Sequence, residues 1–74
     1  MIQELDRIVL ATDLPEYNLK NGDIGTVVLV HQEGVGYEVE FVSLTGKTLA
    51  IASLFNSQVR LISDREIAHA RALN

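Results

Sequence analysis

The sequence predicts a small, mainly β protein: a five-stranded barrel followed by a short C-terminal α-helix. Five short apolar segments separated by turn residues occupy residues 1–62, and the remaining positions change to a helical pattern. A chain of 74 residues leaves room for a single domain over 1–74, with the barrel at about 5–62 and the helix at about 64–73. A closed or half-closed barrel is expected because it leaves the fewest unpaired strand edges.

The first strand is predicted over residues 7–11, which are rich in β-branched and aliphatic side chains. Residues 13–18 follow as a loop or a bent edge, because Pro15 has no N–H to give to a ladder. Residues 20–23 form a turn in which Asn and Gly tolerate a positive φ. The longest connection of the predicted barrel is therefore its first loop.

The second strand is predicted over residues 24–31, and its run 27–30 is apolar on both faces. Gly25 interrupts this β-branched strand, which indicates a bulge or a place where a Cβ would clash. Because a small barrel has a single interior, some of this apolar surface is expected to be covered by the terminal helix, by another copy or by another protein.

The third strand, at residues 37–41, alternates cleanly between apolar and acidic side chains. Three side chains are expected to face the core, Tyr37, Val39 and Phe41, and two to face outward, Glu38 and Glu40.

The fourth strand is predicted over residues 48–54, with Leu49 and Ile51 on one face. Residues 55–57 form a short break of one 3₁₀ turn, and Phe55 is expected in the core. The fifth strand covers residues 58–62, with Val59 and Leu61 inward.

The predicted helix starts at a capping box formed by Ser63 and Glu66. Alanines at positions 68, 70 and 72 favour helix, and Ile67 and Leu73 contribute to a narrow apolar stripe. At about ten residues the helix is too short to be stable alone, so it is expected to dock.

Residues 5–10 and 19–28, the second with G-D-I-G-T-V at 22–27, resemble the start of SH3-like barrels of the KOW type. More closely, the chain resembles a small uncharacterised bacterial family of SH3-like proteins, a domain-of-unknown-function family. The residues that carry this resemblance are 4–7, 13–17, 22–28, 37–41 and 58–60. The resemblance implies a barrel, no established activity and, because members are short stand-alone proteins, a small partner protein.

Composition excludes several classes of protein. Ten acidic residues against six basic ones give a net charge of −4, which opposes binding to a nucleic-acid backbone. The chain has no Cys, so it has neither a disulfide framework nor a thiolate metal site. The longest apolar runs are too short for a transmembrane helix or a signal-peptide core, and we expect a cytoplasmic protein.

The residues that could carry chemistry have simpler interpretations. Glu38 and Glu40 fit a solvated strand face better than an acid–base pair. His31 and His69 are too few and too far apart in sequence for a metal site. The serines lack a nucleophile-elbow motif, and the glycines lack a phosphate-binding pattern. We therefore expect no catalysis, no cofactor and no metal.

The first loop is the predicted binding surface for another protein. Three acids, Asp13, Glu16 and Asp23, would steer a basic partner, with Tyr17 between them as an anchor. Apolar strand positions or the helix would supply further contact area. The alternative is that Tyr17 packs its ring on the barrel and the acids only keep the protein soluble. A small acidic protein of this kind suits an antitoxin or immunity-like role, by analogy. The alternatives are a KOW-like RNA- or ribosome-associated module and an accessory subunit of an enzyme.

Overall fold

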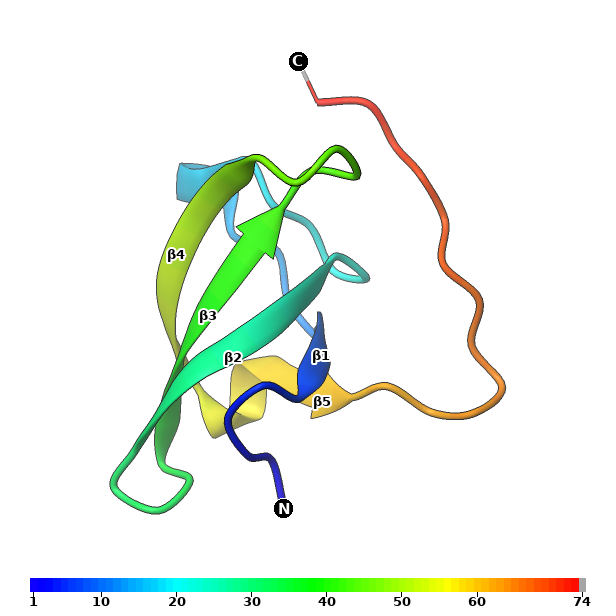
Figure 1. Cartoon of the computed structure of the whole chain (residues 1–74). Coiled ribbons are helices and arrows are strands. Elements are labelled where there is room, and N and C mark those ends of the chain that lie inside the picture. The colour runs from blue at the N-terminus through cyan, green and yellow to red at the C-terminus, as the bar shows by residue number, and fades with distance from the viewer. Residues whose placement is uncertain (74) are drawn as a thin grey trace.

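The computed structural model describes residues 1–73 and contains a five-stranded antiparallel sheet of order β4-β3-β2-β1-β5 (Figure 1). The strands are β1 (Arg7–Leu10), β2 (Ile24–His31), β3 (Gly36–Val42), β4 (Thr48–Phe55) and β5 (Val59–Leu61). Two 3₁₀ turns, η1 (Pro15–Tyr17) and η2 (Asn56–Gln58), lie in the first loop and between β4 and β5. The five predicted strands are confirmed within one or two residues at each end.

The sheet is strongly bent, and β4 and β5 are its two edges (Figure 1). The pairings recorded for residues 1–73 join β1 to β2 and β5, β2 to β3, and β3 to β4. Hydrogen bonding within this part of the chain therefore makes an antiparallel sheet rather than a closed barrel.

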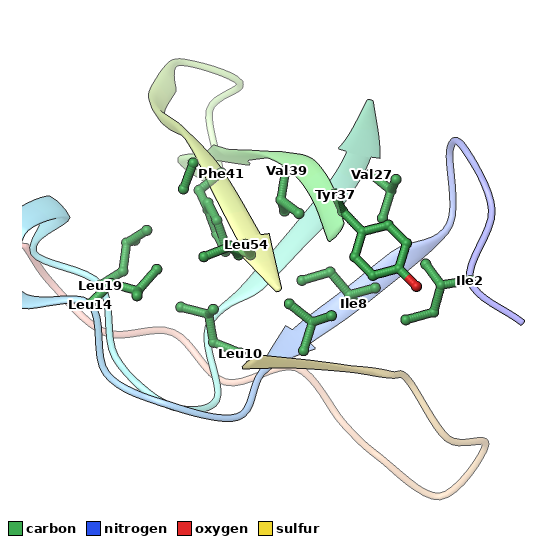
Figure 2. Packing of buried hydrophobic residues seen from close by; sticks show 12 residues of the cluster. Ile2, Ile8, Leu10, Leu14, Leu19, Val27, Tyr37, Val39, Phe41 and Leu54 are labelled. Carbon is green, nitrogen blue, oxygen red and sulfur yellow. The ribbon is translucent and has the colours of Figure 1, made fainter. Parts of the chain in front are cut away.

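One hydrophobic core lies on the inner side of the bend, and every strand contributes to it (Figure 2). The predicted inward face of β3 is confirmed, because Tyr37, Val39 and Phe41 are all buried. The phenolic hydroxyl of Tyr37 donates to Asn56 Oδ1 at 3.1 Å, which satisfies its polar end inside an apolar site. The other buried members of the cluster are Ile2, Ile8, Leu10, Leu14, Leu19, Val27, Ala52, Leu54 and Val59.

Gly25 is required by side-chain packing. A Cβ at this position would lie 2.6 Å from Val39 Cγ1 and 2.8 Å from Phe41 Cε1, so the predicted clash is confirmed. The register irregularity of β2 lies elsewhere, between Val27 and Leu29. The extra residue there, Val28, is exposed. Part of the apolar run at residues 27–30 therefore lies outside the small core.

Two side chains expected in the core are not buried. Phe55 is 66% exposed, because strand alternation places it on the outer side of β4 while Ala52 and Leu54 fill the inner side. Leu61 is 44% exposed, because β5 ends there, at the rim of the core, although Val59 is buried as predicted.

The prediction of a C-terminal helix at about 64–73 is wrong. Residues 62–73 contain no helix and run as an extended tail past the turns at 20–23 and 43–47 (Figure 1). Half of the capping box forms, since Ser63 N donates to Glu66 Oε1 at 2.9 Å, but no helical ladder follows. The short segment offers no buried stripe that would stabilise a helix, and Ile67 is 93% exposed.

Candidate functional site

The outer face of β3 and β4 carries a row of exposed apolar side chains. Successive outward positions of β4 hold Leu49, Ile51, Ser53 and Phe55, and the three apolar members are 43%, 56% and 66% exposed. In the register with β3, Ile51 lies opposite Glu40 and Ser53 lies opposite Glu38. We call these six residues the β3–β4 outer face: Glu38, Glu40, Leu49, Ile51, Ser53 and Phe55.

The two carboxylates of this face are held by hydroxyl groups of β4. Ser53 Oγ donates to Glu38 Oε2 at 2.7 Å, and Thr48 Oγ1 donates to Glu40 Oε2 at 2.6 Å. The hydrogen bond from Ser53, together with the nearby His31, lowers the pKa of Glu38 below its ordinary value. Both acids thus stand beside the apolar row in fixed orientations, and Glu38 keeps its negative charge at neutral pH.

His31, Glu38 and Ser53 meet, but in an order that differs from a hydrolytic triad. His31 Nε2 and Ser53 Oγ both lie 2.7 Å from the same oxygen, Glu38 Oε2. In a triad the histidine stands between the nucleophile and the acid and takes the proton of the serine. Here the carboxylate stands in the middle, and its lowered pKa makes it a weaker base. His31 and Ser53 therefore orient the carboxylate of Glu38 on the surface and do not form a hydrolytic triad.

The structure separates the four residues predicted to bind a partner into two groups. Asp13 Oδ1 accepts a hydrogen bond from Asn21 N at 2.8 Å, and Asp23 Oδ2 accepts one from Lys20 N at 2.8 Å. These two acids therefore stabilise the first loop. Glu16 and Tyr17 lie on η1 and are exposed.

An ion pair between Arg71 and Asp23 joins the tail to the first loop. Arg71 Nε donates to Asp23 Oδ1 at 2.9 Å, and its terminal nitrogen donates to Asp23 Oδ2 at 2.6 Å and to the carbonyl of Asn18 at 3.1 Å. The hydrogen bond from Arg71 is the main cause that lowers the pKa of Asp23. Sequence reasoning missed this contact because it assigned Arg71 to a helix face.

A second ion pair fixes the start of the tail. The guanidinium of Arg60, in β5, donates to both carboxylate oxygens of Glu66 at 2.8 and 2.6 Å. This contact is the largest of the causes that lower the pKa of Glu66 to about 2. The tail thus contacts the rest of the chain through ion pairs at two points, Glu66 and Arg71.

A largely apolar groove of about 590 Å³ lies beside the Arg71–Asp23 ion pair, with the sheet and its loops on one side and residues 68–73 of the tail on the other. Its sheet side includes Ile24, Phe41, Val42, Leu44 and Leu49. Its tail side consists of Ala68, His69, Ala70, Arg71 and Leu73. Leu49 belongs to both the groove and the β3–β4 outer face, so the two surfaces are continuous.

Groups of three or more metal-ligating side chains are absent from residues 1–73. His31 binds Glu38 on the sheet, whereas His69 lines the groove beneath the tail. Within the same residues, no helix has the length and apolar character that crossing a membrane requires.

Comparison with known proteins gives one match. A family model described as "Domain of unknown function (DUF4926)" matches residues 4–61. No curated protein matches the chain, and no solved structure matches it. The match begins before β1 and ends with β5, so it includes all five strands and leaves out the tail. On this coverage, the chain belongs to the DUF4926 family of domains of unknown function.

Proposed function

We propose that this protein is a non-enzymatic protein-binding module whose partner docks on the β3–β4 outer face. The observation that carries the proposal is the exposed row of Leu49, Ile51 and Phe55 on a strand at the edge of the sheet. An edge strand presents backbone donors and acceptors to a partner, and exposed aromatic and aliphatic side chains supply the buried area that specific association needs.

The partner is a basic protein. Glu38 and Glu40 stand next to the apolar row, and Glu16 adds a further exposed acid on η1. The net charge of −4 accelerates the encounter with a positively charged surface. A small acidic protein that covers a basic one suits an antitoxin or immunity-like role in a bacterial cytoplasm.

We assign the sheet to the SH3-like class, of the KOW type. The assignment is supported by the long first loop, by the 3₁₀ turn η2 directly before the last strand, and by the pairing of β1 with both β2 and β5. In this scheme the single domain is a half-closed barrel over about 5–62, and the tail is an addition to it.

The test is affinity capture from the native host with three forms of the full chain. The wild-type protein is compared with Ile51→Lys, which places a positive charge in the outer face, and with Val35→Lys. Val35 is 55% exposed in the β2–β3 hairpin and serves as the matched control. We expect one basic chain to be captured by wild type and Val35→Lys and lost with Ile51→Lys.

Capture that is unchanged by Ile51→Lys contradicts the proposed surface. Two other outcomes replace the proposed function. Retention of RNA in filter binding, with an affinity that falls steeply with salt, indicates the ribosome- or RNA-associated class. Co-purification with a catalytic chain indicates an accessory subunit.

A further inference from the structure

We propose that the groove beneath the tail is a docking site for an extended, arginine-bearing segment of a partner protein. In the structure, Arg71 of the tail occupies the position on Asp23 that the partner's arginine would take. The inference rests on the proposed function as a binding module and adds to it a second contact site and the chemistry of the segment that enters it.

The anchor for a guanidinium group is preformed by the first loop. The Asp23 carboxylate is oriented by the backbone N–H of Lys20 at 2.8 Å, and its side chain is 19% exposed. Asn18 has a φ of 59°, in the left-handed region, and its carbonyl accepts from the guanidinium at 3.1 Å. Two carboxylate oxygens and one carbonyl match the planar fork of an arginine better than the point charge of a lysine.

The space beside this anchor suits apolar side chains. The sheet side of the groove includes Ile24, Phe41, Val42 and Leu44. The tail lines the groove with two small side chains, Ala68 and Ala70, beside the larger His69, Arg71 and Leu73, and a volume of about 590 Å³ is left open. A segment with larger apolar residues beside its arginine would fill this space and remove more apolar surface from water than the tail does.

The tail itself is held weakly and can be displaced. Beyond Glu66, the hydrogen bonds of the described tail to the rest of the chain are those of the Arg71 side chain. Residues 67–73 are all exposed. The tail also lies outside the residues that match the family model. The Arg71–Asp23 pair is partly exposed, with side-chain exposures of 31% and 19%. Because an ion pair that solvent still reaches contributes little stability, a partner segment competes against a small free-energy cost.

A partner protein is a better occupant than a second copy of this chain. The tail is tethered to its own domain, so its effective concentration at the groove is on the order of millimolar. A tail from a second copy offers the same contacts without that advantage. A foreign segment can offer better ones, because the groove is left partly empty by Ala68 and Ala70.

The experiment uses the tail as its own probe. The full chain carrying Arg71→Gln, labelled with ¹⁵N, is titrated with a synthetic peptide of residues 63–73. We expect saturable shifts of the amide signals of Asn18, Asp23, Ile24 and Val42. The peptide should bind wild type at least about threefold more weakly, because the tethered tail competes. A peptide with Leu in place of Ala at positions 68 and 70 should bind Arg71→Gln more tightly than the native sequence.

Two controls separate arginine recognition from general attraction. Peptides carrying Arg71→Gln or Arg71→Lys should bind at least about tenfold more weakly, and the chain with both Asp23→Asn and Arg71→Gln should lose the response. Absence of saturable shifts, equal affinity of the arginine and lysine peptides, or equal affinity for wild type and Arg71→Gln overturns the inference.

The remaining outcomes identify another occupant or separate this inference from the proposed function. Light scattering that shows a wild-type dimer, abolished by Arg71→Gln, replaces the partner segment with a second copy. If the peptide does not bind, but capture of the partner still depends on Ile51, the groove is rejected as a docking site and the β3–β4 outer face remains the proposed one. If the peptide binds, but capture of the partner is unchanged by Ile51→Lys, the outer face is rejected and the groove remains the proposed docking site.

Discussion

Arg71 and Asp23 lie 48 positions apart in the sequence and are joined by two hydrogen bonds of 2.9 and 2.6 Å. This contact fixes the end of an extended tail on the first loop. It also gives Asp23 a role within the chain, where the charge pattern alone suggests a residue that faces a partner.

Removal of the ion pair should release the tail without unfolding the sheet. We expect Asp23→Asn and Arg71→Gln each to lower the free energy of unfolding by about 1 kcal/mol or less, since exposed ion pairs are worth little. Heteronuclear NOE values of residues 67–73 should fall to those of a flexible chain. The double variant should be no worse than the more severe single one, because both remove the same contact. Strictly additive effects would show that the two side chains act independently.

Acid should release the start of the tail. The pKa of Glu66 in the folded protein is lowered to about 2, mainly by Arg60. The contact is therefore complete above the unfolded pKa of a glutamate, weakens as the pH falls below it, and is lost as the pH falls through about 2. The side-chain NMR signal of Arg60 should change over that window. It should stay constant in Glu66→Gln, and an equal change in that variant would assign the effect to another group.

Gly25 should tolerate no side chain. A Cβ would lie 2.6 Å from Val39 and 2.8 Å from Phe41, both of which are buried and have little room to move. We expect Gly25→Ala to destabilise by about 1–3 kcal/mol and Gly25→Val by at least as much, measured by chemical denaturation. Thr26→Val, one residue along on the other face, is the control and should change stability by about 0.5 kcal/mol or less. A neutral Gly25→Val would contradict the packing described for β2 and β3.

The two sides of β4 should respond differently to substitution. Leu54→Ala removes a buried side chain and should cost about 2–5 kcal/mol. Ile51→Thr keeps a β-branched residue on the exposed side and should cost about 0.5 kcal/mol or less. Thermal melts of the two variants make the comparison. Similar losses would mean that the outer face is covered in solution.

Once the partner is known, the exposed residues of η1 should separate into kinetic roles. Glu16→Gln should lower the association rate at low salt, because a rim charge steers the encounter. Tyr17→Ala should raise the dissociation rate, because an aromatic side chain holds the complex. Surface plasmon resonance at two salt concentrations measures both. Asp13→Asn, which weakens the bond to Asn21 within the loop, is the control for indirect effects. Unchanged rates for the two η1 variants would exclude η1 from the contact surface and restrict the partner to the β3–β4 outer face.

The strands could be predicted because their signals are local. Tyr37, Val39 and Phe41 alternate with acids, and the turn at 20–23 has a glycine, Gly22, at a φ of 98°. The exposed face of β4 was harder to predict, because Leu49, Ile51 and Phe55 are as apolar as the core residues beside them. Periodicity finds the two faces of such a strand but does not say which one is covered.

The tail could not be predicted for a different reason. Ser63 and Glu66 supply a local helix signal, and their hydrogen bond forms. The same Glu66 is also bound by Arg60, and Arg71 is bound by Asp23 on the first loop. Arg60 is only six positions from Glu66, but its competition for that carboxylate is not part of the helix signal. The contact of Arg71 spans 48 positions, which no local sequence window contains.

The unpaired edge of β4 also affects the solubility of the purified protein. Thr48–Phe55 contains no charged residue, although lysines and other charges are the usual protection of an exposed strand edge against aggregation. Repulsion between molecules that each carry a net charge of −4 opposes the pairing of two such edges. Salt screens that repulsion over about 8–10 Å and leaves backbone pairing intact. Concentrated samples should therefore stay clear at low ionic strength and cloud as salt is added, and Ile51→Lys should remain soluble in both conditions.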